Sequence, residues 1–230
     1  MANKGMPTPG RQPFHGGVLG LRPIQDGDAA TDSSSAMGRG GVQLRVSVDG
    51  VDWDLVTVHL KSKLLTYPGG RFAPDDEDQR ARFGAYALYR RAAEAATVRV
   101  HADTVLDGQG RDRRLIVLGN LNDTPQAATT QLLCGPPGSQ FDTGRFDHPD
   151  QGDAWRLWTL APRIPVEHRF SRIFEGQPEL IDHILISHAL LGDLASVDAD
   201  VSALSSIGTN PNVRRDAPAS DHAPLIAHFN

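Results

Sequence analysis

The chain lacks several features that define common classes of protein. Its 230 residues include one cysteine, Cys134, so no internal disulfide can form and a cytoplasmic location is expected. No apolar run approaches the length of a membrane-spanning helix, and the first residues lack the apolar core of a secretory signal. The net charge of −5 and the absence of basic clusters disfavour a pure nucleic-acid binding module.

The composition that remains is that of a globular protein. Hydrophobic residues make up 39% of the chain and charged residues 22%, and the length suits one substantial domain. No two histidines show the spacing of a zinc motif, so we predict no zinc site. Residues 1–38 are poor in periodic pattern and predict an irregular arm, which leaves residues 39–230 as the domain.

The first part of the domain shows clear local patterns. Apolar residues alternate from Val42 to Val48, which predicts a strand with one wet face. Asp49-Gly50 predicts a tight turn, and a return strand is expected from Trp53 to Leu60. A long helix is predicted to begin near Asp75 and to run towards Leu106, with acidic residues in its first turn.

The stretch LIVLGNLNDTP at 115–125 is the centre of the prediction. Leu115 to Leu118 is an apolar run that indicates a buried strand ending at Gly119, with polar residues directly after it. Thr124 is predicted to cap a short helix that runs through Leu133. Further strands are expected at 168–174 paired with 180–187, at 194–201 and at 225–229. Two loops, 64–74 and 135–153, are expected to shape specificity.

Four polar clusters fall at the ends of predicted strands: VHLKSK at 58–63, GNLND at 119–123, IDHILIS at 181–187 and SDHAPL at 220–225. In this order they resemble the HLxS, GDxND, IDxIL and SDHxP motifs of the endonuclease/exonuclease/phosphatase superfamily. The resemblance covers roughly residues 38–230. It implies an α/β fold of the deoxyribonuclease type, a four-layer sandwich of two mixed β-sheets flanked by helices.

The resemblance does not extend to the start of the family's domain. Family members begin with a strand that ends in Asn, then a helix, then a strand that ends in a metal-binding Glu. Residues 1–41 match neither strand, and no glutamate precedes Glu77. We therefore expect a fold that is incomplete at its amino-terminal end.

The motifs imply a divalent-metal-dependent phosphoesterase, either a nuclease or a phosphatase. His222 resembles the histidine that acts as base or acid, with Asp182 as the carboxylate that orients it. His59 resembles the second histidine, on the phosphate side, and Asn122 the asparagine that contacts phosphate. Asp221 resembles a ligand of the expected cation, Mg²⁺ or Mn²⁺.

Asn120 occupies a catalytic position where the family usually has Asp. An amide has the shape of a carboxylate but cannot take its charge or a proton. A rate loss on the order of 10²-fold follows if this group is the general base. Lys61 and Arg172 are two cations that could meet phosphate oxygens, but an exposed salt bridge is the favoured interpretation of each.

Two functional hypotheses follow from these residues. The first is an enzyme that hydrolyses a phosphate ester, with nucleic acid as one candidate substrate. The alternative is a catalytically inactive or truncated relative that acts as a binding protein, which the missing Glu and Asn120 favour. Taken singly, each site residue is also an ordinary polar group at a strand end or turn. The sequence does not indicate an oligomeric state.

Overall fold

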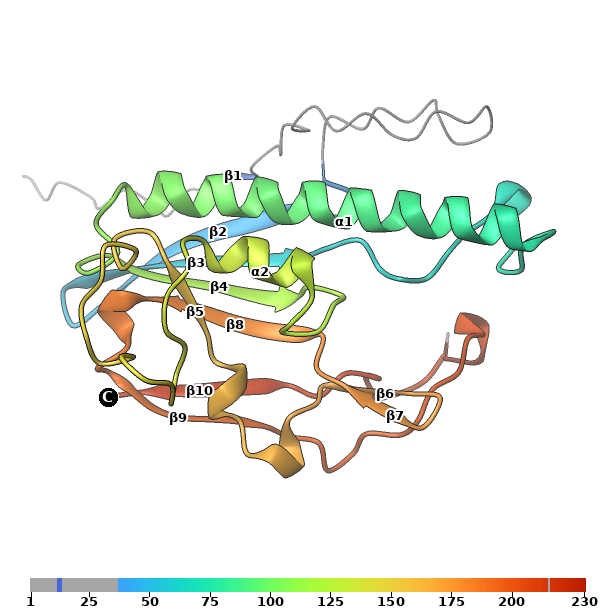
Figure 1. The fold of residues 1–230 in the computed structure, drawn as a ribbon. Helices are drawn as coiled ribbons and strands as arrows, with labels where there is room; N and C mark the ends of the chain where they lie inside the picture. The colour runs from blue at the N-terminus through green and yellow to red at the C-terminus, as the bar shows by residue number, and fades with distance from the viewer. Residues whose placement is uncertain (1–11, 14–36, 215) are drawn as a thin grey trace, which may run out of the picture.

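The computed structural model describes residues 12–13, 37–214 and 216–230. Its main sheet has the strand order β1-β2-β3-β4-β8-β5 (Figure 1). β3 and β4 run parallel and the other neighbours antiparallel, so this sheet is mixed. Its strands are β1 (Gln12–Pro13), β2 (Gly41–Val48), β3 (Val51–His59), β4 (Arg114–Asn120), β8 (Asp182–Ser187) and β5 (Leu157–Thr159).

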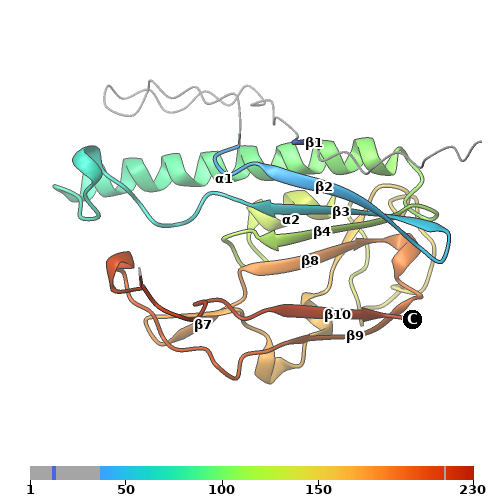
Figure 2. The same cartoon turned by 180° about the vertical axis from the view of Figure 1, so that it is seen from behind.

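Two antiparallel pairs accompany the main sheet. β9 (Leu194–Ala199) pairs with β10 (Leu225–Phe229), and β6 (Arg172–Phe174) pairs with β7 (Gln177–Glu179). Seen from behind, the β9–β10 pair lies below β8, on the side of the main sheet away from the long helix (Figure 2).

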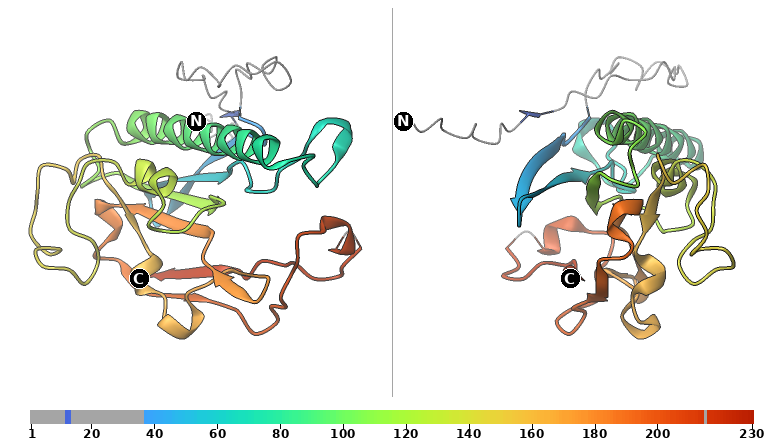
Figure 3. Two further views of the ribbon diagram at one scale, coloured as in Figure 1. Left: turned by 45° about the vertical axis from the view of Figure 1, so that its right-hand side comes forward. Right: turned by 90° about the vertical axis from the view of Figure 1, so that its left-hand side faces the viewer.

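Two helices cover the opposite side of the sheet, α1 (Glu77–Leu106) and α2 (Ala128–Cys134) (Figure 3). The Asp76 carboxylate caps α1 by accepting the N–H of Gln79 at 2.7 Å. The buried residues of α1 recur at helical spacing, which directs one stripe towards the sheet. Short 3₁₀ turns lie at Pro68–Gly70, Ala161–Arg163, Val166–His168, His188–Leu190 and Pro211–Arg214.

Side chains of the central strands alternate between two cores. On β4, Leu115 and Val117 pack on the helix side, and Ile116 and Leu118 pack on the side of β9 and β10. The neighbouring strand β8 follows the same rule, since Leu185 joins the first core and the residues on either side of it join the second. A strand that is buried on both faces lacks a polar face, which explains the continuous apolar run in the sequence.

The described residues therefore form three layers, helices, main sheet and β9–β10 pair, and they confirm the α/β class. The predicted fourth layer and second mixed sheet are not seen in this part of the chain. Within it, β10 hydrogen-bonds only to β9, so the second layer is two strands wide. That width leaves Val42, Leu44 and Val46 of β2 about 40% exposed on the same side of the main sheet.

Several local predictions are confirmed. The strand, turn and return strand over residues 41–59 are present, and both turn residues, Asp49 and Gly50, have positive φ. The long helix and the last strand, 225–229, lie where the sequence predicts them.

Other boundaries are wrong. β4 continues through Gly119, where a Cβ would lie 2.0 Å from the carbonyl oxygen of Val58, so only glycine fits. The short helix begins at Ala128 and not after Thr124, whose carbonyl instead closes a separate turn with the N–H of Ala127. The strand over 182–187 joins the main sheet, and 172–174 pairs with 177–179. The sequence prediction misses β5.

The predicted arm, residues 1–38, lies outside the described residues except for 12–13 and the last two positions. Met37 is buried in the core beneath α1. Among the described residues, no helix combines the length and apolarity needed to cross a membrane.

Candidate functional site

Three of the predicted site residues stand side by side in the main sheet. In the strand register His59 of β3 is the partner of Asn120 on β4, and Asn120 is the partner of Asp182 on β8. Paired residues point to the same face of a sheet. These three side chains therefore form a row on the side that faces β9 and β10.

His222 meets this row from the segment just before β10. Its Nδ1 lies 2.7 Å from Oδ2 of Asp182, and both side chains are about one-fifth exposed. A carboxylate can only accept a hydrogen bond, so Nδ1 carries the proton. The other ring nitrogen, Nε2, is then the one that can accept a proton from a water molecule.

Ser171 holds Asp182 from a second direction. Its hydroxyl donates to Oδ2 of Asp182 at 2.7 Å and accepts the N–H groups of Ile181 and Asp182 at 3.1 Å each. The carbonyl of Ser171 accepts the N–H of Ala223, the residue after His222. A single buried serine thus fixes both members of the His–Asp pair. No sequence motif marks Ser171, so its contact with Asp182 cannot be predicted from the sequence.

The two asparagines of the GNLND segment hold the loop after β4. Oδ1 of Asn120 accepts the N–H of Asn122 at 2.8 Å, which closes an Asx turn. Asn122 has φ +55° and donates from Nδ2 to the carbonyl of Leu60 at 2.8 Å. Asn122 is 4% exposed. It therefore joins the two segments that directly follow β3 and β4.

His59 lies next to a cation that the sequence analysis does not consider. Nη1 of Arg39 lies 2.9 Å from Nδ1 and 2.5 Å from Nε2 of His59. Burial lowers the pKa of His59, and the charge of Arg39 lowers it further. The charge of Asp182 raises this pKa, and the charge of His222 lowers it.

The predicted metal ligand forms an ion pair. The carboxylate of Asp221 contacts the guanidinium of Arg214. No group of three His, Cys, Asp or Glu side chains in the described part of the chain is arranged to hold a metal ion. Mg²⁺ prefers several hard oxygen ligands, and this donor set does not provide them. The metal-binding role of Asp221 stays a prediction.

The two nearby cations differ in their contacts. Arg172 forms a salt bridge with Glu179, as predicted, but the pair is half-buried and not exposed. Lys61 instead donates to the carbonyls of Ser62 and Leu64, at 3.1 and 3.0 Å.

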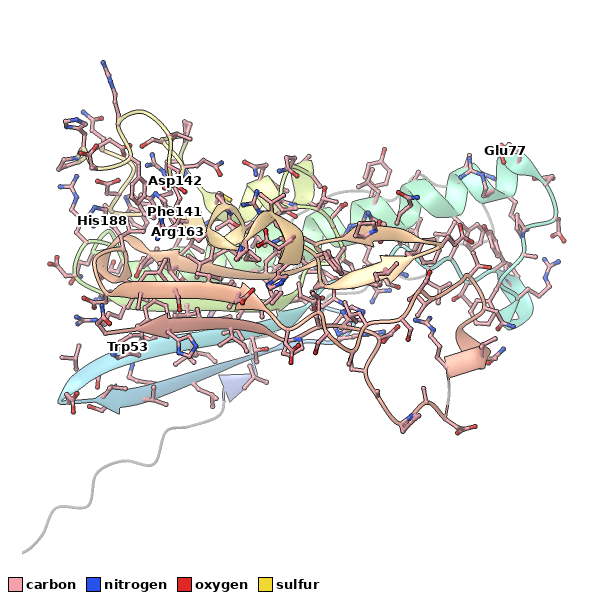
Figure 4. The ribbon with its side chains drawn as sticks, turned by 90° about the horizontal axis from the view of Figure 1, so that it is seen from below. Trp53, Glu77, Phe141, Asp142, Arg163 and His188 are labelled. Carbon is pink, nitrogen blue, oxygen red and sulfur yellow. The ribbon has the colours of Figure 1, made fainter. Side chains whose placement is uncertain are left out.

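One loop expected to shape specificity lies far from the row. The N–H of Gly110 bonds to the carbonyl of Ala154, and Arg111 bonds to Asp150, which ties the 135–153 loop to the start of β4. Figure 4 shows Phe141 and Asp142 of this loop at the end of the sheet where β3 begins. The row lies at the opposite end, where β3 ends. The role of this loop in specificity stays a prediction.

The fold and the row define an α/β protein with a buttressed His–Asp pair at one end of a mixed sheet. A family model described as "Endonuclease/Exonuclease/phosphatase family" matches residues 34–222. The chain belongs to this family, whose members are hydrolases that act on phosphoester bonds. A search of curated proteins finds no match.

Solved structures give more distant likenesses. A 3′ phosphatase, NExo from Neisseria, bound to a product DNA hairpin, is 20% identical with a TM-score of 0.45, over 90% of this chain and 70% of that one. Truncated TDP2 from Caenorhabditis elegans is 13% identical with a TM-score of 0.47, over 96% and 64%. An AP endonuclease from Archaeoglobus fulgidus is 14% identical with a TM-score of 0.42, over 82% and 65%. The chain thus spans about two thirds of each of these structures.

Proposed function

We propose that this chain hydrolyses a phosphate ester, with His222 as the general base and Asp182 as the carboxylate that orients it. The observation that carries the proposal is the 2.7 Å contact between the two side chains, in a row that also holds His59 and Asn120. A family of phosphoester hydrolases supplies the reaction class.

In this proposal five of the chain's own residues each perform one task. Nε2 of His222 takes a proton from the attacking water, while Asp182 stabilises the imidazolium that forms. As the water oxygen bonds to phosphorus, the ester P–O bond breaks, and the leaving oxygen takes a proton from solvent. Asn120 keeps its amide nitrogen free to donate, because its oxygen is engaged by the N–H of Asn122. His59 faces the phosphate, and Asn122 supports the site by joining the segments that directly follow β3 and β4.

The described residues do not fit a divalent cation, so no step is assigned to one. A metal in the family role would need oxygen ligands beyond Asp221, whose carboxylate already pairs with Arg214. Hydrolysis assays with EDTA, Mg²⁺ and Mn²⁺ measure this requirement directly.

The test of the proposal is hydrolysis of a generic phosphodiester, a phosphomonoester and a short DNA duplex by the wild type and by His222→Ala. The matched control is His168→Ala, because His168 forms a similar contact with Asp198 on the exposed surface, at 2.8 Å. Loss of hydrolysis in His222→Ala, with full activity in the control, is the expected result. A rate that His222→Ala leaves unchanged contradicts the proposal.

A second candidate is a phosphate-binding relative without catalysis. Among the described residues no three acidic, His or Cys side chains are arranged to hold a metal ion, and this donor set and the amide at position 120 favour the second candidate. It predicts that inorganic phosphate binds to the row while every ester in the assay stays intact. Hydrolysis that depends on His222 excludes it.

A further inference from the structure

The short segment before β2 brings an arginine to the site. Arg39 lies two residues before the first residue of β2, and its guanidinium contacts the ring of His59 across 20 residues of sequence. An arginine can only donate hydrogen bonds, and of the two ring nitrogens that it lies near, a neutral imidazole leaves one unprotonated to accept, whereas an imidazolium leaves none. This contact therefore favours the neutral form of His59.

A buried carboxylate fixes the two segments that carry these side chains. Oε1 of Glu94 accepts the N–H of Gly38 at 3.0 Å, and Oε2 accepts the N–H of Lys61 at 2.6 Å. Glu94 projects from α1 and is 5% exposed. Because Gly38 precedes Arg39 and Lys61 follows His59 by two residues, Glu94 holds the backbone of both segments at one point.

Arg39 differs from the neighbouring cations in its partners, because their charged groups bind carboxylates or backbone carbonyls. Within the residues that the structure describes, no carboxylate oxygen lies within 4.0 Å of the Arg39 guanidinium. Lys61 donates to two backbone carbonyls. Other cations of this region form ion pairs: Arg214 with Asp221, Lys63 with Asp123 and Glu179, Arg91 with Asp123, and Arg90 with Glu94.

We propose that Arg39 binds the phosphate group of the substrate, and that Glu94 is the positioning residue that keeps Arg39 beside His59. The inference rests on the proposed function, because it assigns the ligand of the same site. A guanidinium donates two parallel hydrogen bonds to phosphate oxygens, in a geometry that lysine cannot match. Since Arg39 is exposed, its side chain can turn from the imidazole to an incoming anion without a change in the fold.

The experiment measures binding of inorganic phosphate, in the presence of EDTA, by calorimetry and by the NMR signals of the His59 ring. Arg39→Gln is the test variant, and Arg80→Gln, on the exposed face of α1, is the control. Loss of a charge-assisted pair predicts that Arg39→Gln weakens phosphate affinity about tenfold or more. Arg39→Lys keeps the charge but cannot donate two parallel hydrogen bonds, so its phosphate affinity should lie between those of Arg39→Gln and Arg80→Gln.

The same spectra test the contact itself. Removal of the Arg39 charge should raise the pKa of His59, whereas Arg80→Gln should leave it unchanged. The other charged or titratable groups that act on His59 are Asp182, His222 and Glu94, and all three are kept in both variants. An unchanged pKa in Arg39→Gln overturns the proposal, because the contact is then absent in solution.

The failure of this inference can be told apart from the failure of the proposed function. Phosphate binding that Arg39→Gln does not weaken, or a wild type that binds no phosphate, overturns the role of Arg39. Phosphate binding that depends on Arg39, in a protein that hydrolyses no ester, supports this role and overturns the enzymatic proposal. Glu94→Gln adds a second check, since one amide cannot accept both N–H groups and phosphate affinity should fall.

Discussion

The molecule contains two His–Asp pairs of nearly equal length in different surroundings. Nδ1 of His222 lies 2.7 Å from Asp182, and Nδ1 of His168 lies 2.8 Å from Asp198. The side chains of the first pair are 24% and 20% exposed, and those of the second are 41% and 55% exposed. The distance between the two groups therefore does not by itself distinguish a site from a surface contact.

The second contacts of each aspartate make the difference. Asp182 also accepts the hydroxyl hydrogen of Ser171, and it is the strand partner of Asn120. Asp198 accepts only a further bond from the N–H of its own neighbour, Ala199, among the contacts that the structure describes. Groups from three parts of the chain hold the first pair in one geometry, which is what a general base requires. The second pair is a local surface contact.

The largest expected effect comes from breaking the first pair. His222→Ala and Asp182→Asn should each reduce the hydrolysis rate by about 10²-fold or more, because the base is lost or its tautomer is no longer fixed. The equivalent changes in the second pair, His168→Ala and Asp198→Asn, should leave the rate unchanged. Steady-state assays of the four variants settle the comparison. Equal losses in both pairs would contradict it.

A further loss is expected from a change next to the first pair. Asn120→Asp replaces the amide donor with a carboxylate, which cannot donate to the phosphate and repels its charge, so with His222 as the base we expect the rate to fall by about tenfold or more. One carboxylate oxygen can still accept the N–H of Asn122, so the turn should persist. Circular dichroism serves as the control for folding. A rate that rises in a folded variant would show that position 120, and not His222, is the base.

A smaller effect is expected when the serine that holds Asp182 is removed. Ser171→Ala removes a donor to Asp182 and the acceptor of two backbone N–H groups, which should lower the free energy of unfolding by about 1–3 kcal/mol. The rate should fall by less than in His222→Ala, because the base itself remains. Urea unfolding and kcat measure the two effects separately. A normal rate in Ser171→Ala would show that the hydroxyl does not position Asp182.

The smallest effect concerns the titration of the surface pair. The hydrogen bond from His168 and the N–H of Ala199 lower the pKa of Asp198. The resulting stabilisation is present above the unfolded value, about 3.9, and is lost as the pH falls through the folded pKa. His168→Ala should raise this pKa towards its ordinary value, as read from the carboxyl carbon signal in NMR. No change in the pKa would show that the surface contact is absent in solution.

The sequence predicts what depends on local patterns. The hairpin over 41–59 and the long helix follow from alternation, a turn dipeptide and a capping aspartate, all of which act between near neighbours. The convergence of His59, Asp182 and His222 follows from motifs placed at strand ends. Their mutual geometry is confirmed, whereas their chemical roles stay predictions.

What the sequence does not predict depends on contacts between distant residues. Ser171 donates a hydrogen bond to Asp182, and Glu94 accepts one from Gly38. Both bonds join residues that are distant in the sequence, and neither Ser171 nor Glu94 lies in a motif. The sequence predicts a hairpin between 168–174 and 180–187. The turn at Glu175-Gly176 instead joins β6 to the short strand β7, and the strand over 182–187 pairs with β4 in the main sheet. Only tertiary structure shows that the 135–153 loop lies at the other end of the sheet.

The most direct test of the account is a crystal structure of the protein grown with inorganic phosphate. We predict a phosphate ion against the row, in contact with His59, with Arg39 and with Nε2 of His222. A phosphate found only elsewhere on the molecule, or a His222 ring turned away from Asp182, would contradict the account.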